Sequence, residues 1–167
     1  MKNLVKFTVL AVAILGTASA AGAQASKSTT LTATAAVATD IAVAGSPLNF
    51  GTAYRSEGAH SIAANVAGSG SFLVTGTAGS SVGTTFPSLP TDLLSGATTL
   101  PVTWVFATIA SNAACTTGTV GTGTVPSSLT LGVSGDSRIC IGGTVTPAVG
   151  QLIASYTGTI NITVAFP

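Results

Sequence analysis

The chain has 167 residues, of which only 5% are charged and 5% aromatic, and its formal net charge at pH 7 is +1. It has no cluster of Lys and Arg to neutralise phosphates, which excludes nucleic-acid binding, and soluble monomers usually carry about a quarter charged residues. Because so few charges give little electrostatic repulsion between copies, the composition suits a protein that is located outside the cell or packs against copies of itself.

The first 25 residues follow the pattern of a secretory signal peptide. Lys2 and Lys6 form a basic start, residues 7–15 form an apolar run broken only by one Thr, and small residues dominate up to Ala25. A membrane-spanning helix is the alternative, but it needs roughly 20 apolar residues. We therefore expect export, with cleavage between Ala25 and Ser26.

Residues 26–167 then form the mature protein, whose length suits one domain. No further long apolar segment follows, so we expect no membrane span in it. Its charged residues are Lys27, Asp40, Arg55, Glu57, Asp92, Asp136 and Arg138.

Cys115 and Cys140 are the only cysteines. An even count in an exported chain predicts a disulfide, although two buried free thiols are the alternative. Chain-entropy arithmetic for a loop of this size gives about 3.5 kcal/mol of stabilisation. Two cysteines and the distant His60 do not make four zinc ligands, so no metal site is expected.

Residues 29–43 alternate between apolar and polar positions. Leu31, Ala33, Ala35 and Val37 share one face, and Thr or Ala residues occupy most of the other. A period of two predicts a long strand with one buried face, which Gly45-Ser46-Pro47 would end.

Further short strands are predicted along the middle of the chain, separated by Gly, Ser and Pro. In residues 100–107, Val102, Trp104 and Phe106 share a face, so this segment is expected to be a core strand. Residues 76–97 are rich in Gly, Ser, Thr and Pro and are expected to be mostly loop, and residues 115–125 fit a strand or a loop. The other expected strands are residues 48–54, 61–66, 71–75, 129–133 and 138–146.

The clearest alternation lies in residues 156–166, which are expected to form one long terminal strand. Its apolar face carries Tyr156, Ile160, Ile162, Val164 and Phe166. Many short strands with turn signals predict an all-β sandwich or barrel. The edge of a long terminal strand would also invite a further strand.

Three motifs carry a resemblance to a known family. They are Leu48-Asn49-Phe50-Gly51, Ile141-Gly142-Gly143-Thr144-Val145, and residues 156–164 with Gln151 ahead of them. In this order the motifs resemble the secreted bacterial β-domains catalogued as domain of unknown function 4402. That family in turn looks like the subunits of chaperone–usher pili.

The resemblance implies an immunoglobulin-like, pilin-like antiparallel β-sandwich that lacks one strand. A neighbouring subunit's N-terminal extension would fill the gap, which makes copies of this chain or related subunits the expected partners. A periplasmic chaperone and an outer-membrane usher are further implied partners, and the cell surface is the implied location.

Residues 28–37 resemble such an extension. Leu31, Ala33, Ala35 and Val37 would enter a groove bordered by the terminal strand, with Tyr156, Ile160, Ile162, Val164 and Phe166 along its edge. Donor segments often carry bulkier residues than Ala33 and Ala35, so shallow pockets are expected here.

The sequence offers little chemistry. Glu57 and two serines lie near His60, but residues 132–136 fail the Gly-x-Ser-x-Gly elbow at Asp136. The glycine-rich residues 118–123 lack the Lys and the following helix of a phosphate-binding loop. We therefore expect no catalytic residues, no cofactor and no enzyme activity.

Two functions remain open. The first is a structural or adhesive subunit of a surface fibre, assembled by strand donation. The second is a self-contained secreted β-sandwich that binds another ligand or a matrix, in which residues 29–43 are the domain's own first strand.

Overall fold

The computed structural model describes residues 32–35, 37, 40–120 and 124–167. The predicted signal peptide, its cleavage site and Leu31 lie outside the described residues. The chain divides into two units, residues 1–36 and residues 37–167, and all the strands belong to the second unit.

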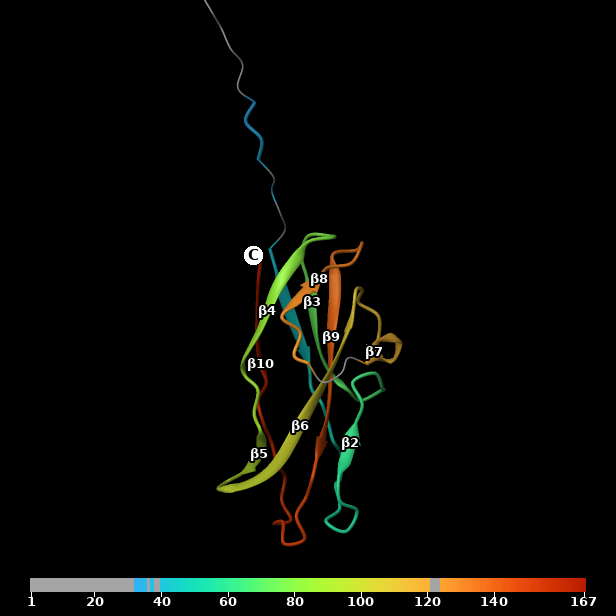
Figure 1. Cartoon of the computed structure of the whole chain (residues 1–167), viewed down its shortest axis with the longest axis vertical. Coiled ribbons are helices and arrows are strands. Elements are labelled where there is room, and N and C mark those ends of the chain that lie inside the picture. The colour runs from blue at the N-terminus through green and yellow to red at the C-terminus, as the bar shows by residue number, and fades with distance from the viewer. Residues whose placement is uncertain (1–31, 36, 38–39, 121–123) are drawn as a thin grey trace, which may run out of the picture. The chain divides into compact units, whose positions relative to one another are not determined.

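The second unit is built almost entirely of antiparallel strands (Figure 1). One sheet has the order β1-β3-β9-β6-β5, with β2 added to β9 and β7 added to β6, and the other has the order β10-β4-β8. The elements are β1 (Ala42–Ser46), β2 (His60–Ile62), β3 (Gly70–Thr75), β4 (Ser81–Ser88), β5 (Asp92–Ser95), β6 (Thr98–Ile109), the short 3-10 helix η1 (Cys115–Thr117), β7 (Thr119–Val120), β8 (Ser128–Thr130), β9 (Asp136–Val145) and β10 (Asn161–Ala165). The predicted all-β, sandwich-like antiparallel fold is thus confirmed.

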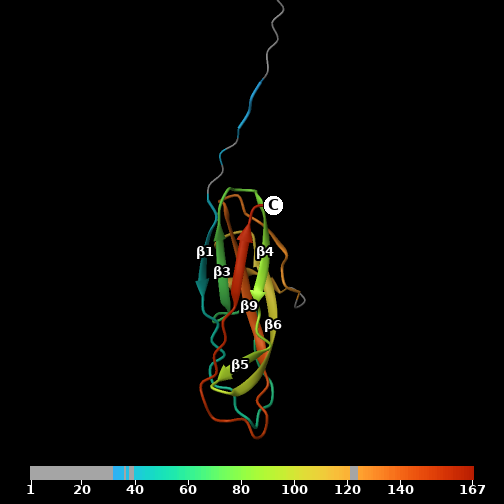
Figure 2. The same ribbon diagram turned by 90° about the vertical axis from the view of Figure 1, so that its left-hand side faces the viewer.

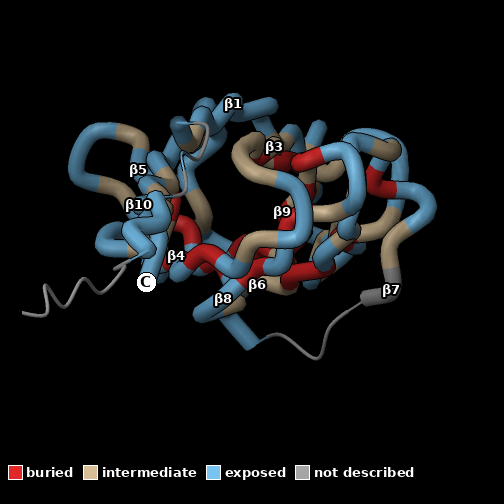
Figure 3. Tube along the Cα trace, turned by 90° about the horizontal axis from the view of Figure 1, so that it is seen from above, coloured by how far each residue is buried: buried red, intermediate tan, exposed pale blue. Residues whose placement is uncertain are grey.

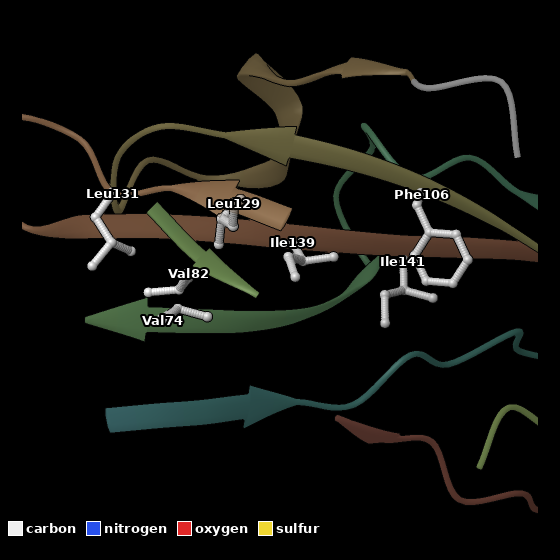
Figure 4. Packing of buried hydrophobic residues seen from close by; sticks show 7 residues of the cluster. All are labelled: Val74, Val82, Phe106, Leu129, Leu131, Ile139 and Ile141. Atoms are coloured by element: carbon white, nitrogen blue, oxygen red, sulfur yellow. The ribbon is translucent and has the colours of Figure 1, made fainter. Parts of the chain in front are cut away.

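The main core lies between the two sheets (Figure 4). The larger sheet contributes Val74, Phe106, Ile139 and Ile141, and Val82, Leu129 and Leu131 come from the side of the smaller sheet. The buried positions concentrate on the central strands β3, β6 and β9 (Figure 3). The predicted core strand around Trp104 is therefore confirmed, with Val102 and Phe106 buried on either side of it.

The described residues of 29–43 do not form the long strand that the alternation predicted. Of residues 32–35, 37 and 40–43, only Ala42 and Val43 belong to a strand, and every residue of β1 is exposed. The reason is the length of the partner: Ala42 pairs with Thr75, the last residue of β3, so Asp40 and Ile41 have no partner in that strand. β1 itself is outermost, beside β3 (Figure 2).

Residues 76–97 are not mostly loop, because they contain β4 and β5. In β4, Val82 and Thr84 are buried and Phe86 is half-buried, which is the period of two. The hydroxyl of the buried Thr84 donates a hydrogen bond to the carbonyl of Pro126 at 2.6 Å. The Gly, Ser and Thr content predicted a loop, but the segment forms a strand. Packing stabilises the inward face of this strand, and the hydrogen bond satisfies the buried hydroxyl.

Several predicted strands are shorter than expected or missing. The terminal strand covers only Asn161–Ala165, and residues 48–54 form no strand. Strands β2 and β8 stop at Ile62 and Thr130, before the predicted ends. In residues 115–125 the described part holds η1 and the two-residue β7.

The predicted disulfide between Cys115 and Cys140 is present. It fastens η1 to the face of β9 turned away from the main core, where both cysteines pack with Ala64 and Ala107. Next to it, a Cβ on Gly142 would collide with the backbone of residues 62–64, so the connection after β2 can cross β9 only at a glycine.

Replacing Cys140 with Ser should lower the free energy of unfolding by about 3.5 kcal/mol, because the open loop gains conformational freedom in the unfolded chain. Urea unfolding of oxidised protein measures the loss. The control is Cys115→Ser, which removes the same bond and should cost about as much, while the double variant should cost little more. A loss below about 1 kcal/mol in both single variants would contradict the prediction.

Candidate functional site: an apolar groove with unpaired walls

A groove of about 1090 Å³ opens into the sandwich between two segments that belong to no strand over most of their length. One wall is residues 45–56, which continue β1, and the other is residues 151–160, which lead into β10. We call these segments the first wall and the second wall. The floor consists of large apolar side chains from β3, β5, β6 and β9, namely Phe72, Leu93, Leu100, Trp104, Ile141 and Val145.

The first wall is held to the domain mainly through Phe50. His60 Nε2 lies 2.7 Å from the Phe50 carbonyl oxygen, and because a carbonyl only accepts, this nitrogen carries the hydrogen. The Phe50 ring lies against Trp104, with centroids 6.2 Å apart. His60, the only histidine, is thus a structural residue of the wall, with its Nε2 committed to the backbone.

The second wall is held at two places. Thr157 exchanges two backbone hydrogen bonds with Leu94 of β5, at 2.8 and 2.9 Å. Gln151 Nε2 donates to the Thr99 carbonyl at 2.8 Å and to the Tyr156 hydroxyl at 2.6 Å, and that hydroxyl donates to the Leu152 carbonyl at 2.9 Å. This wall is therefore fixed in place without being part of a sheet ladder.

Both walls leave backbone hydrogen-bonding groups without protein partners. Among the described residues, the only backbone-to-backbone hydrogen bonds of residues 152–160 are the two at Thr157, and residues 47–53 make none. In the first wall the Gly51 N–H bonds to the Asn49 side chain, and the Phe50 carbonyl accepts from His60. Within the described part of the chain, the other backbone groups of residues 47–53 have no protein partner, as at a sheet edge that can accept another strand.

The predicted groove-edge residues are divided between the groove and the core. Tyr156 and Ile160 line the groove, and Ile160 also packs against the main core together with Ile162 and Val164 of β10. Phe166 is 40% exposed, beyond the end of β10. The segment beside the groove is thus the one that precedes β10.

The predicted donor residues are placed only in part. Ala33, Ala35 and Val37 are exposed and belong to no strand, and Val37 is 99% exposed. No internal pairing of these three residues is present. Leu31 lies outside the described residues.

The first wall and Arg55 were not anticipated as site residues. The signal for the wall was present: Leu48, Phe50 and Tyr54 alternate in a segment that was predicted as a strand. The sequence could not show that the segment has no neighbouring strand in the sheets, because pairing depends on residues far away in the chain.

Metal ligands and membrane spans are two further features on which the sequence made a prediction. The described residues include no cluster of three or more His, Cys, Asp or Glu side chains that could hold a metal ion. Nor does the described part of the chain contain a helix long and apolar enough to cross a membrane. Comparisons with protein-family models, with curated proteins and with solved structures returned no match for this chain. The family resemblance seen in the motifs therefore stays a prediction.

Proposed function

We propose that this chain is an exported, pilin-like subunit of a surface fibre, whose groove receives an extended segment of a neighbouring copy as an added strand. The observation that carries the proposal is an apolar floor between two walls with unpaired backbone groups. Strand addition uses these two features together, because backbone hydrogen bonds supply attachment and side-chain pockets set the register.

The proposed occupant is the segment around residues 29–37 of a second copy. Its inward face would be Leu31, Ala33, Ala35 and Val37, and its outward face is mainly Thr and Ala. The floor carries large side chains such as Phe72 and Trp104. Small donor residues suit such a floor, because bulky ones would overpack it.

The size of the groove also favours a chain segment over a small molecule. Pockets for small ligands enclose about 300–1,000 Å³. The volume of this groove, about 1090 Å³, lies at the top of that range, but its walls of twelve and ten residues run farther than one small ligand requires. The low charge of the chain also favours a fibre, because neighbouring copies can lie close together without strong electrostatic repulsion.

Export through the signal peptide and assembly by a periplasmic chaperone and an outer-membrane usher would complete this function. Both partners come from the family resemblance. A chaperone would serve the same groove, because an exposed apolar floor with open edges aggregates unless it is covered.

A synthetic peptide of residues 26–37 should bind the mature chain carrying Leu31→Asp, a variant that keeps the groove but cannot donate its own segment. Trp104 is the only tryptophan and forms part of the floor, so its fluorescence should change saturably with peptide concentration.

A peptide with Leu31→Asp should not bind, and one with Thr32→Asp, which places the same charge on the opposite face, should bind. Absence of binding by the unmodified peptide would refute strand donation. The alternative would then be favoured, a self-contained β-sandwich that takes a different extended ligand in the same groove.

A further inference from the structure

Arg55 stands at one end of the groove without a carboxylate partner. Its exposed guanidinium donates a hydrogen bond from Nη1 to the carbonyl of Gln151 at 3.0 Å, which joins the two walls at this end. No described carboxylate lies within ion-pair distance of it, although Glu57 is only two residues away. In a chain with so few charges, a free cation at the end of an apolar groove invites an acidic partner.

The same end of the groove carries exposed apolar side chains. Tyr54 and Leu152 are each 56% exposed, and Ile153 is 83% exposed. All three line the groove and flank Arg55 or its partner Gln151 in the sequence. Apolar side chains gathered around one free charge are typical of a surface that another protein covers.

The domain continues past the opposite end of the groove, whose lining includes only the last two residues of β1 and none of β10. There β1 begins and β10 ends, and the side chains of Ile41 and Phe166 both come within 4 Å of the position that a Cβ on Gly76 would take. We therefore take the Arg55 end as the exit of a segment that fills the groove. The donating copy must lie beyond that end.

The residues between the donor segment and β1 of the donating copy connect the two, and their number limits which donor residue can reach Arg55. Asp40 follows Val37 by three residues, so their Cα atoms can be at most about 11 Å apart. β1 of the donor begins at Ala42, two residues later. With Val37 seated in the last part of the groove, Asp40 of the donor reaches the Arg55 end, and Asp40 is exposed.

We infer that Arg55 pairs with Asp40 of the copy that donates the strand, beside an apolar contact formed by Tyr54, Leu152 and Ile153. This inference rests on the proposed strand donation and adds the junction between successive subunits. Such a junction fixes the direction of the added strand, because the reverse direction would carry Asp40 to the opposite end. It is also head-to-tail, so it extends into a fibre and does not close a dimer.

The test uses peptides that do or do not reach Asp40. The protein is the full mature chain with Leu31→Asp, either with its native Arg55 or with Arg55→Asp, and Trp104 fluorescence reports binding. Peptide 26–41 should bind the Arg55 chain about fivefold more tightly at low salt than the same peptide with Asp40→Lys. On the Arg55→Asp chain this preference should reverse, and at high salt both differences should shrink.

Peptide 26–37 lacks Asp40, so its affinity for each chain measures what Arg55→Asp does to the groove itself, including loss of the bond to Gln151, and the affinity of each longer peptide is compared with that value. The failures are separable. If peptide 26–37 does not bind, strand donation itself is wrong, and the junction falls with it. If it binds, but Asp40→Lys changes no affinity on either chain, the junction is overturned and strand donation stands.

Discussion

The mature chain with Leu31→Asp should form no SDS-resistant ladders under conditions in which the native chain forms them. In the proposed fibre Leu31 is the largest inward side chain of the donor segment, and a carboxylate there would be held in an apolar groove without a partner. Burying an unpaired charge costs far more than a single apolar contact contributes, so assembly should be lost and not merely weakened. Unheated SDS gels and electron microscopy of the assembled protein measure this.

The matched control is Thr32→Asp, which adds the same charge one residue away on the opposite face of the segment. Ladders should persist with that variant, although charge repulsion can reduce their length. Equal loss of ladders in both variants would show that the charge acts without regard to face, and would count against a strand with one buried side. Ladders in the Leu31→Asp chain would contradict strand donation directly.

Replacing Phe106 with Ala should lower the free energy of unfolding by about 3–5 kcal/mol. Phe106 is only 2% exposed and belongs to the main core, with its ring centroid 5.3 Å from that of Phe86. Removing the ring loses its burial and leaves a cavity between the two sheets, which the antiparallel ladders on either side prevent from closing. Because the free energy of unfolding of small domains is about 5–15 kcal/mol, this single change could remove most of the stability of the domain.

Urea unfolding followed by circular dichroism measures this loss, with Thr108→Ala as the control. Thr108 is exposed on the same strand, so its replacement should change the stability by less than about 0.5 kcal/mol. A cost below about 1 kcal/mol for Phe106→Ala would mean that the two sheets do not share the core described here.

The sequence alone was sufficient for the fold class and for the cross-link. Alternation with a period of two around Val102, Trp104 and Phe106 is a local property, and it identified the central strand because buried and exposed faces must alternate along it. The pairing of Cys115 with Cys140 followed from their number, since two cysteines in a chain predicted to be exported have one partner each. Neither inference needed to know which strand lies beside which.

Tertiary structure decided where the strands end and where the groove lies. A strand needs a partner as well as a pattern. The alternation of residues 29–43 continues ahead of β1, but β3 ends at Thr75, opposite Ala42, and offers Asp40 and Ile41 no partner. β4, in contrast, pairs on both sides despite its Gly and Pro. The groove exists because residues 45–56 and 151–160, distant in the sequence, are held apart over one apolar floor without a strand between them. Backbone pairing is set by contacts between distant segments, so the same alternation can end up as a strand, as the wall of a groove, or unpaired.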